Sequence, residues 1–187
     1  MAKKILNKKW AQLIVHFLAY NATWFACVFS AIKGYAWVGL SVALVITLLQ
    51  FIWQHTVAHR TRNLLCFLIY LTIIGFVGDS LMSFLGIISF SANPFSLAVS
   101  PPYMLGIWIN FAMLFYVLLN KLIYQPTILV LLSFVGFAGA YQVGAKMGVA
   151  TINGGLHSVI GIGLFWAVLF PCSVIFFDRL IGFPEDK

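Results

Sequence analysis

The sequence predicts an all-α, polytopic membrane protein built as a bundle of about six transmembrane helices. Two observations indicate this class: 63% of the residues are hydrophobic, and only 8% are charged. A soluble domain usually carries about 25% charged residues, which keep its surface polar. The mean hydropathy of +1.03 therefore places most side chains against lipid or against one another.

Six apolar stretches approach the length of about 20 helical residues that crosses roughly 30 Å of hydrocarbon. In chain order, the predicted spans cover residues 10–32, 35–54, 64–88, 103–119, 127–146 and 156–177. The connections between them are short, so we expect a single transmembrane domain over residues 1–187.

Three of these elements need separate justification. Lysines precede span 10–32, but its apolar run exceeds the 7–15 residues usual in a cleaved signal peptide, so we expect a retained helix. Span 64–88 is long enough to tilt or break. It leads into the only long connection, residues 89–102, which carries no charge. We expect that connection to lie at the membrane interface or to form a lid.

The distribution of basic residues predicts that both chain ends lie in the cytoplasm, because cytoplasmic loops are enriched in Lys and Arg. Six spans place nine of the eleven basic residues on the side of the termini. The other two, Lys33 and Lys146, lie on the opposite side. The nine are Lys3, Lys4, Lys8, Lys9, Arg60, Arg62, Lys121, Arg179 and Lys187.

The net charge of +7 does not indicate nucleic-acid binding, because the basic residues flank apolar spans instead of forming a basic face. We expect membrane lipids as partners, together with a membrane-protein partner. The three cysteines all lie in apolar stretches without a CxxC pair, which argues against a disulfide framework or a zinc site.

Asp79 is the strongest candidate for a functional residue. It is the only acid well inside a predicted span, and Gly75 and Gly78 precede it. An ionisable group at that depth costs several kcal/mol unless it has a partner. Asp79 is therefore either a ligand, proton or cation site, or a carboxyl group that packs helices together.

Four other polar residues fall at a similar depth in other spans. We predict that they and Asp79 line a polar pocket that opens to the outer side of the membrane. The alternative is that each one only hydrogen-bonds a neighbouring helix, at about 0.6 kcal/mol per bond. These predicted ligand-binding residues are Asn21, Asn110, Gln142 and His157.

Small residues recur every four positions in span 127–146 and just beyond it, at Gly136, Ala140, Gly144 and Gly148. This spacing places them on one helix face, where a neighbouring backbone can approach closely. We predict helix packing there, with a substrate groove as the alternative.

His55 and His59 lie one helical turn apart, a spacing that can bind a metal ion. Membrane di-iron lipid oxidases use such pairs, but they need several more histidines, and this chain has four in all. We therefore expect no metal and no cofactor. Because GxSxG, Walker A and HExxH motifs are also absent from the sequence, we expect a non-enzymatic role.

Several segments support a family resemblance: NATWFACV, GFVGDSLMSFLGIISF, PPYMLGIWINFAMLF, GFAGAYQVGAKMG and FWAVLFP. On these segments the sequence resembles a family of bacterial inner-membrane proteins grouped as domain of unknown function 2878. The resemblance implies a multi-pass protein of the bacterial inner membrane and brings no established activity. Genes of that family often sit beside genes for lipid-modifying enzymes. A weaker likeness, in size and span number, is to the substrate-binding subunits of vitamin importers.

Three functional hypotheses follow from the sequence. The first is binding or transport of a small or lipid-like solute, with Asp79 as the charged anchor of an outward-facing pocket. The second is a scaffold or accessory protein for membrane-lipid modification or envelope assembly, which would use the Gly136–Gly148 face. The third is a lipid-modifying metalloenzyme that uses His55 and His59.

Overall fold

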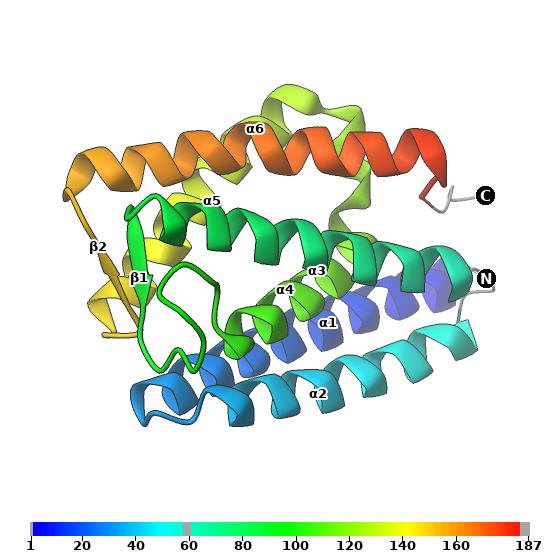
Figure 1. Ribbon diagram of the computed structural model, residues 1–187. Coiled ribbons are helices and arrows are strands. Elements are labelled where there is room, and N and C mark those ends of the chain that lie inside the picture. Colours follow the sequence, from blue (N-terminus) through cyan, green and yellow to red (C-terminus); the bar gives the residue numbers. More distant parts are fainter. Residues whose placement is uncertain (1, 58–60, 184–187) are drawn as a thin grey trace.

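A computed structural model describes the backbone of residues 2–57 and 61–183, and the side chains within residues 10–54, 61–117 and 119–183. The chain alternates between two ends of a helical bundle (Figure 1), and the ends of the described chain lie at the same end. In chain order its elements are α1 (Ala2–Ile32), α2 (Ala36–Val57), α3 (Thr61–Phe84), β1 (Ile88–Phe90), α4 (Pro102–Leu114), η1 (Phe115–Leu119), η2 (Asn120–Tyr124), α5 (Pro126–Lys146), β2 (Ala150–Ile152) and α6 (Leu156–Leu180).

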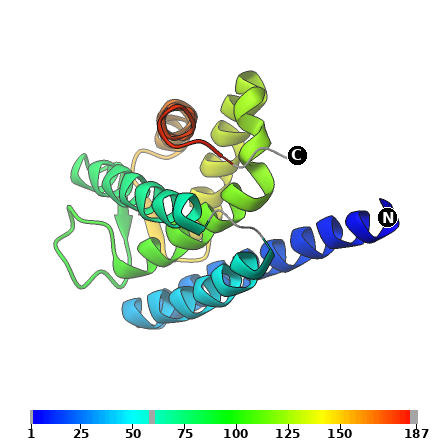
Figure 2. The ribbon, with the colours of Figure 1, turned by 90° about the vertical axis from the view of Figure 1, so that its right-hand side faces the viewer.

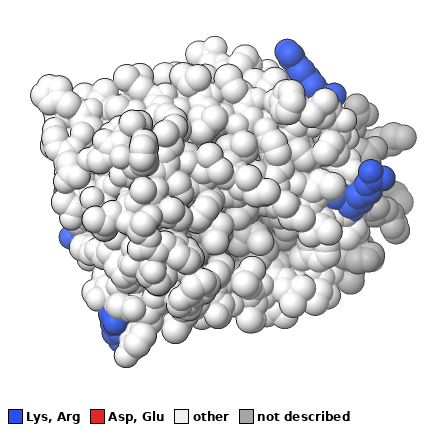
Figure 3. All heavy atoms as spheres, in the orientation of Figure 1, with Lys and Arg blue, Asp and Glu red and all other residues white. Residues whose placement is uncertain are grey.

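Within the described residues, five helices are long and apolar enough to cross a membrane, namely α1, α2, α3, α5 and α6. The protein is therefore a helical membrane bundle, as the sequence predicts. Figure 3 shows Lys and Arg side chains only near the two ends of one face, with an uncharged band between them. That band is the surface that hydrocarbon can cover.

The fourth predicted span is not one continuous α-helix. Its α-helical part begins with Pro102 at the first helical position, where the missing N–H of proline is harmless. The helix then widens into a π-helix, η1, and tightens into a 3₁₀-helix, η2. Most α4 side chains are buried, because α1, α2 and α3 all pack against it.

The third predicted span ends earlier than residue 88. Gly86 adopts a φ of +70°, and the Ile87 N–H donates to the Met82 carbonyl at 3.0 Å. The helix thus ends at a residue in the left-handed backbone conformation, which glycine adopts without steric cost. Ile88 instead begins β1, which pairs antiparallel with β2 in the register Ile88 to Ile152 and Phe90 to Ala150.

The two-stranded sheet lies at the end of the bundle opposite the two ends of the described chain (Figure 1). It ties the end of α3 to the start of α6. The loop that follows β1 is tethered as well, because the Ser91 N–H donates to the Val149 carbonyl at 2.9 Å. The long uncharged connection is therefore pinned against the bundle at its first residue.

Helices α1, α2 and α4 pack closely against one another. A Cβ added to Gly39 would stand 2.8 Å from Cα of Cys27, and one added to Gly106 would stand 2.7 Å from Cβ of Ala43. Neither position accepts a larger side chain without a shift. Small residues thus bring these three helices together, as expected for membrane helices.

Two of the four residues of the predicted packing face on α5 contact no other helix in the described part of this chain. Nothing lies within 4 Å of a Cβ added to Gly136, and Gly148 lies beyond the end of the helix with a φ of +84°. Gly144 is buried and Ala140 half-buried. Helix α5 packs instead against α6. A Cβ added to Gly163 on α6 would stand 2.8 Å from Cε2 of Phe134 on α5.

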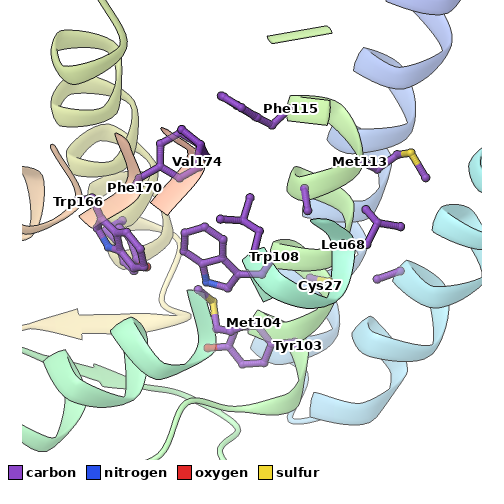
Figure 4. Packing of buried hydrophobic residues seen from close by; sticks show 14 of the residues in the cluster. Cys27, Leu68, Tyr103, Met104, Trp108, Met113, Phe115, Trp166, Phe170 and Val174 are labelled. Atoms are coloured by element: carbon purple, nitrogen blue, oxygen red, sulfur yellow. The ribbon is translucent and has the colours of Figure 1, made fainter. Parts of the chain in front are cut away.

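Large aromatic side chains fill the space between the α5–α6 pair and the other helices. The ring centroids of Trp108 on α4 and Trp166 on α6 lie 4.6 Å apart, and those of Trp166 and Phe137 lie 5.0 Å apart. Figure 4 shows Trp108 facing Trp166 and Phe170, with Tyr103 and Met104 beside it. In the view along the bundle, α6 stands apart from the α1–α2 pair (Figure 2).

Candidate functional site

Asp79 lies in the last third of α3 and is fully buried. Its carboxyl group accepts two hydrogen bonds from two other helices. Nε1 of Trp108 on α4 donates to Oδ2 at 2.7 Å, and the hydroxyl of Tyr141 on α5 donates to Oδ1. The acid therefore joins three helices that are separate in sequence.

Two glycines make room for the aromatic rings beside the acid. A Cβ added to Gly75 would stand 2.0 Å from Cδ2 of Trp108, and one added to Gly78 would stand 2.7 Å from Cη2 of Trp166. A real side chain at either position would collide with an indole. The sequence GFVGD thus places a carboxyl group and two ring-sized spaces within one helical turn of each other.

A cavity of about 70 Å³ lies beside this arrangement. Its walls come mainly from α1, α4 and α5, and residues of β1 and β2 line it at the end nearest the two-stranded sheet. Trp108 and Tyr141 are part of the wall, whereas Asp79 lies behind them. The lining residues are Tyr20, Trp24, Val28, Phe90, Tyr103, Met104, Ile107, Trp108, Phe111, Phe137, Ala140, Tyr141, Gly144, Val149 and Ala150.

The cavity is partly open, and half-buried lining residues on α1 and α5 indicate that it opens between these two helices. Helix α1 packs against α2 and α4, and α5 packs against α6 and β2. The lining side chains Tyr20 and Trp24 on α1, and Phe137 and Ala140 on α5, are only half-buried. At the end nearest the sheet, Tyr103 donates its hydroxyl hydrogen to the Val149 carbonyl at 3.0 Å, which holds the strand end against α4.

Among the described residues, no Lys or Arg pairs with Asp79. The lining also contains no charged side chain. The electrostatic character of the cavity is therefore set by aromatic rings and by the carboxyl group behind two of them. Trp108 and Tyr141 position this group, and the carboxyl group in turn holds the orientation of both rings.

The four other predicted site residues do not line this cavity. Asn21 donates to the Phe17 carbonyl of its own helix at 2.8 Å. Gln142 is half-buried and His157 is exposed. The predicted convergence of five polar residues on one pocket is therefore not what the structure shows.

Asn110 belongs to a second polar cluster, between α1, α2 and α4. Its Nδ2 donates to Oγ1 of Thr47 at 2.8 Å and to Oε1 of Gln50 at 2.7 Å. Nε2 of Gln50 lies 2.8 Å from Nδ1 of His16. With the Gln50 amide nitrogen facing His16 as the donor, Nδ1 is the acceptor, an arrangement that requires the tautomer protonated at Nε2. All four side chains are buried.

Sequence reasoning missed Trp108 and Tyr141. The available signal was their depth: Trp and Tyr usually gather at the membrane interfaces, so a tryptophan inside a predicted span is unusual. It also missed His16 and Gln50, polar residues inside predicted spans.

The histidine pair cannot be placed, because His59 and the side chain of His55 lie outside the described residues. Within the part of the chain that the structure describes, no three His, Cys, Asp or Glu residues are grouped so that they could hold a metal ion. Cys27, Cys66 and Cys172 are free thiols.

The fold and the site define a multi-pass helical membrane protein with a buried acid next to an aromatic cavity. The model of the family described as "Protein of unknown function (DUF2878)" matches residues 13–172. The chain belongs to this family, as its resembling segments indicated. No curated protein and no solved structure matches the chain.

Proposed function

We propose that this protein binds a small or lipid-like solute in the cavity between α1, α4 and α5. The observation that carries the proposal is the cavity itself: it is apolar and aromatic, and it opens between two membrane-spanning helices. Binding sites for small molecules are typically concave and mostly apolar, with a few placed polar groups. Here those polar groups are the Trp108 and Tyr141 side chains held by Asp79.

The size of the cavity favours a ligand that enters only in part. A cavity of roughly 150 Å³ holds benzene, so about 70 Å³ accommodates a head or a short segment. The rest of the solute would extend between α1 and α5 into the surrounding lipid. This geometry fits an amphiphile better than a sugar or a nucleotide, which would bring many polar groups into an apolar opening.

The proposal places the protein in the bacterial inner membrane with both chain ends in the cytoplasm. Its support is the excess of basic residues on the side of the termini. The cavity then lies toward the outer face, near Lys33 and Lys146.

The test uses native mass spectrometry of the protein extracted gently from its own membrane. Ala140 lines the cavity and Val143 on the same helix is exposed, so Ala140→Phe fills the cavity and Val143→Phe is its matched control. We expect a bound solute on the wild type and on Val143→Phe, and its loss from Ala140→Phe. A wild type without any bound solute, or equal retention by both variants, would refute binding in this cavity.

A scaffold role is the second candidate, and the exposed small residues of α5 favour it. Gly136 and Gly139 both face open space in the structure, which leaves a flat surface where another helix can dock. A membrane-lipid enzyme that co-purifies with the wild type and is lost with Gly136→Leu would support this role. Co-purification that Gly136→Leu leaves unchanged would argue against it.

A further inference from the structure

The cavity wall carries an unusual excess of aromatic rings. Eight of its fifteen lining residues are Phe, Tyr or Trp. The faces of such rings carry negative electrostatic potential, and several rings around one space attract an organic cation. Aliphatic residues would serve equally well for a plain hydrocarbon ligand, so the aromatic content calls for a more specific explanation.

When it is ionised, the buried carboxyl group adds to this negative potential. Asp79 accepts a hydrogen bond from Nε1 of Trp108 at 2.7 Å, so only one indole separates the acid from the cavity. An acceptor that carries negative charge makes the donating ring more electron-rich, which strengthens its attraction for a cation on its face. In a site shielded from water, charges interact over longer distances than they do in solution.

An ionised Asp79 carboxylate would have no positively charged partner among the described residues. No Lys or Arg side chain lines the cavity or pairs with Asp79 among the residues that are described. A buried charge usually has a partner, and intramembrane acids commonly mark a site for a cation or a proton. The free space nearest to Trp108 and Tyr141 is the cavity, so a cation there would supply the missing partner.

We propose that the solute of this cavity is a lipophilic organic cation, whose ammonium head sits against Trp108 and Tyr141. This inference rests on the proposed solute-binding function and specifies its ligand class. The apolar part of the molecule extends between α1 and α5 into lipid. An anionic solute would be repelled by an ionised Asp79, and a neutral solute would add no positive partner to the two hydrogen bonds that the carboxyl group accepts.

The experiment compares two probes of equal shape, benzyltrimethylammonium and its uncharged carbon isostere neopentylbenzene. Binding is measured by titration calorimetry in a neutral maltoside detergent, with empty micelles as the blank. We expect the wild type to bind the ammonium about tenfold more tightly or better. Asp79→Asn should remove most of this preference, because it removes the charge while keeping the shape of the side chain.

The matched control is Asp178→Asn, which also removes one carboxylate. Asp178 lies near the end of α6 and does not line the cavity. It should keep the wild-type preference. Should Asp79→Asn fail to fold, Trp108→Phe is the second variant. It keeps an aromatic face but weakens its attraction for cations, so the ammonium should lose several-fold in affinity while neopentylbenzene does not.

The outcomes separate this inference from the proposed function. If both probes bind the wild type equally, or Asp79→Asn keeps the preference for the ammonium, the cation specificity is wrong and solute binding stands. If neither probe binds, and the native protein carries no solute, both proposals fall.

Discussion

Replacing Gly75 with alanine should disrupt the candidate site through a single methyl group. A Cβ at this position would stand 2.0 Å from Cδ2 and 2.4 Å from Cε2 of Trp108. Ordinary van der Waals contacts between carbons begin near 3.5 Å, so the indole has to move by about 1.5 Å. Such a movement breaks its hydrogen bond to Asp79 and displaces one wall of the cavity.

The expected cost follows from these two effects. Overpacking of a tight core costs about 1–3 kcal/mol, and a buried acceptor that loses its donor costs about 1–3 kcal/mol. The better helix propensity of alanine offsets about 1 kcal/mol of this loss. The net loss is roughly 1–5 kcal/mol, which lowers the melting temperature of a chain of this length by roughly 2–20 °C.

The assay is thermal unfolding in detergent, followed by intrinsic fluorescence. Gly136→Ala is the matched control, because it makes the same change on a helix where nothing lies within 4 Å of the new Cβ. We expect Gly136→Ala to melt at the wild-type temperature or a few degrees above it, because alanine favours the helix, and Gly75→Ala to melt below both. Equal melting of all three proteins would show that Trp108 does not pack against α3 as described.

Three further predictions test other parts of the structure. Asn110→Ala should cost about 2–4 kcal/mol of stability, since it leaves its buried partners on α2 unpaired. Asn21→Ala loses only a bond within its own helix and should cost under about 1 kcal/mol in the same melting assay. Similar losses for the two variants would contradict the buried cluster. Gly106→Val should separate α2 from α4 and lower the yield of folded protein in size-exclusion chromatography, and a normal elution profile would count against the close packing seen there. In a cysteine-free background, Leu97→Cys should react with a membrane-impermeant maleimide on intact spheroplasts and Tyr124→Cys only after lysis, whereas the reverse pattern would invert the orientation.

Much of the fold could be predicted because membrane insertion depends on averages over long stretches. Runs of about 20 apolar residues are visible in the sequence without any knowledge of packing. The start of α4 could also be placed closely, since Pro102 marks the first helical position. The end of α3 could not, because the apolar run continues to Ile88 while a single glycine with a φ of +70° ends the helix.

The candidate site was predictable only at its acid. A carboxyl group inside an apolar span is costly wherever its neighbours lie, so the sequence alone singles out Asp79. Its partners follow from the fold: Trp108 and Tyr141 are 29 and 62 residues away. Asn110 shows the opposite case, because its depth suggested the same pocket, whereas its direction on α4 turns it toward Thr47 and Gln50.

The sequence by itself determined the class of this protein, the approximate positions of its helices and the one acid that needs a partner. Those features depend on transfer of residues from water to lipid, which composition and spacing describe. Only the tertiary structure decided which helix faces meet, that Asp79 sits behind the cavity wall, and that the glycines of α3 make room for indole rings. Those features depend on rotation and contact between helices, and side-chain shape controls them over distances of a few ångströms.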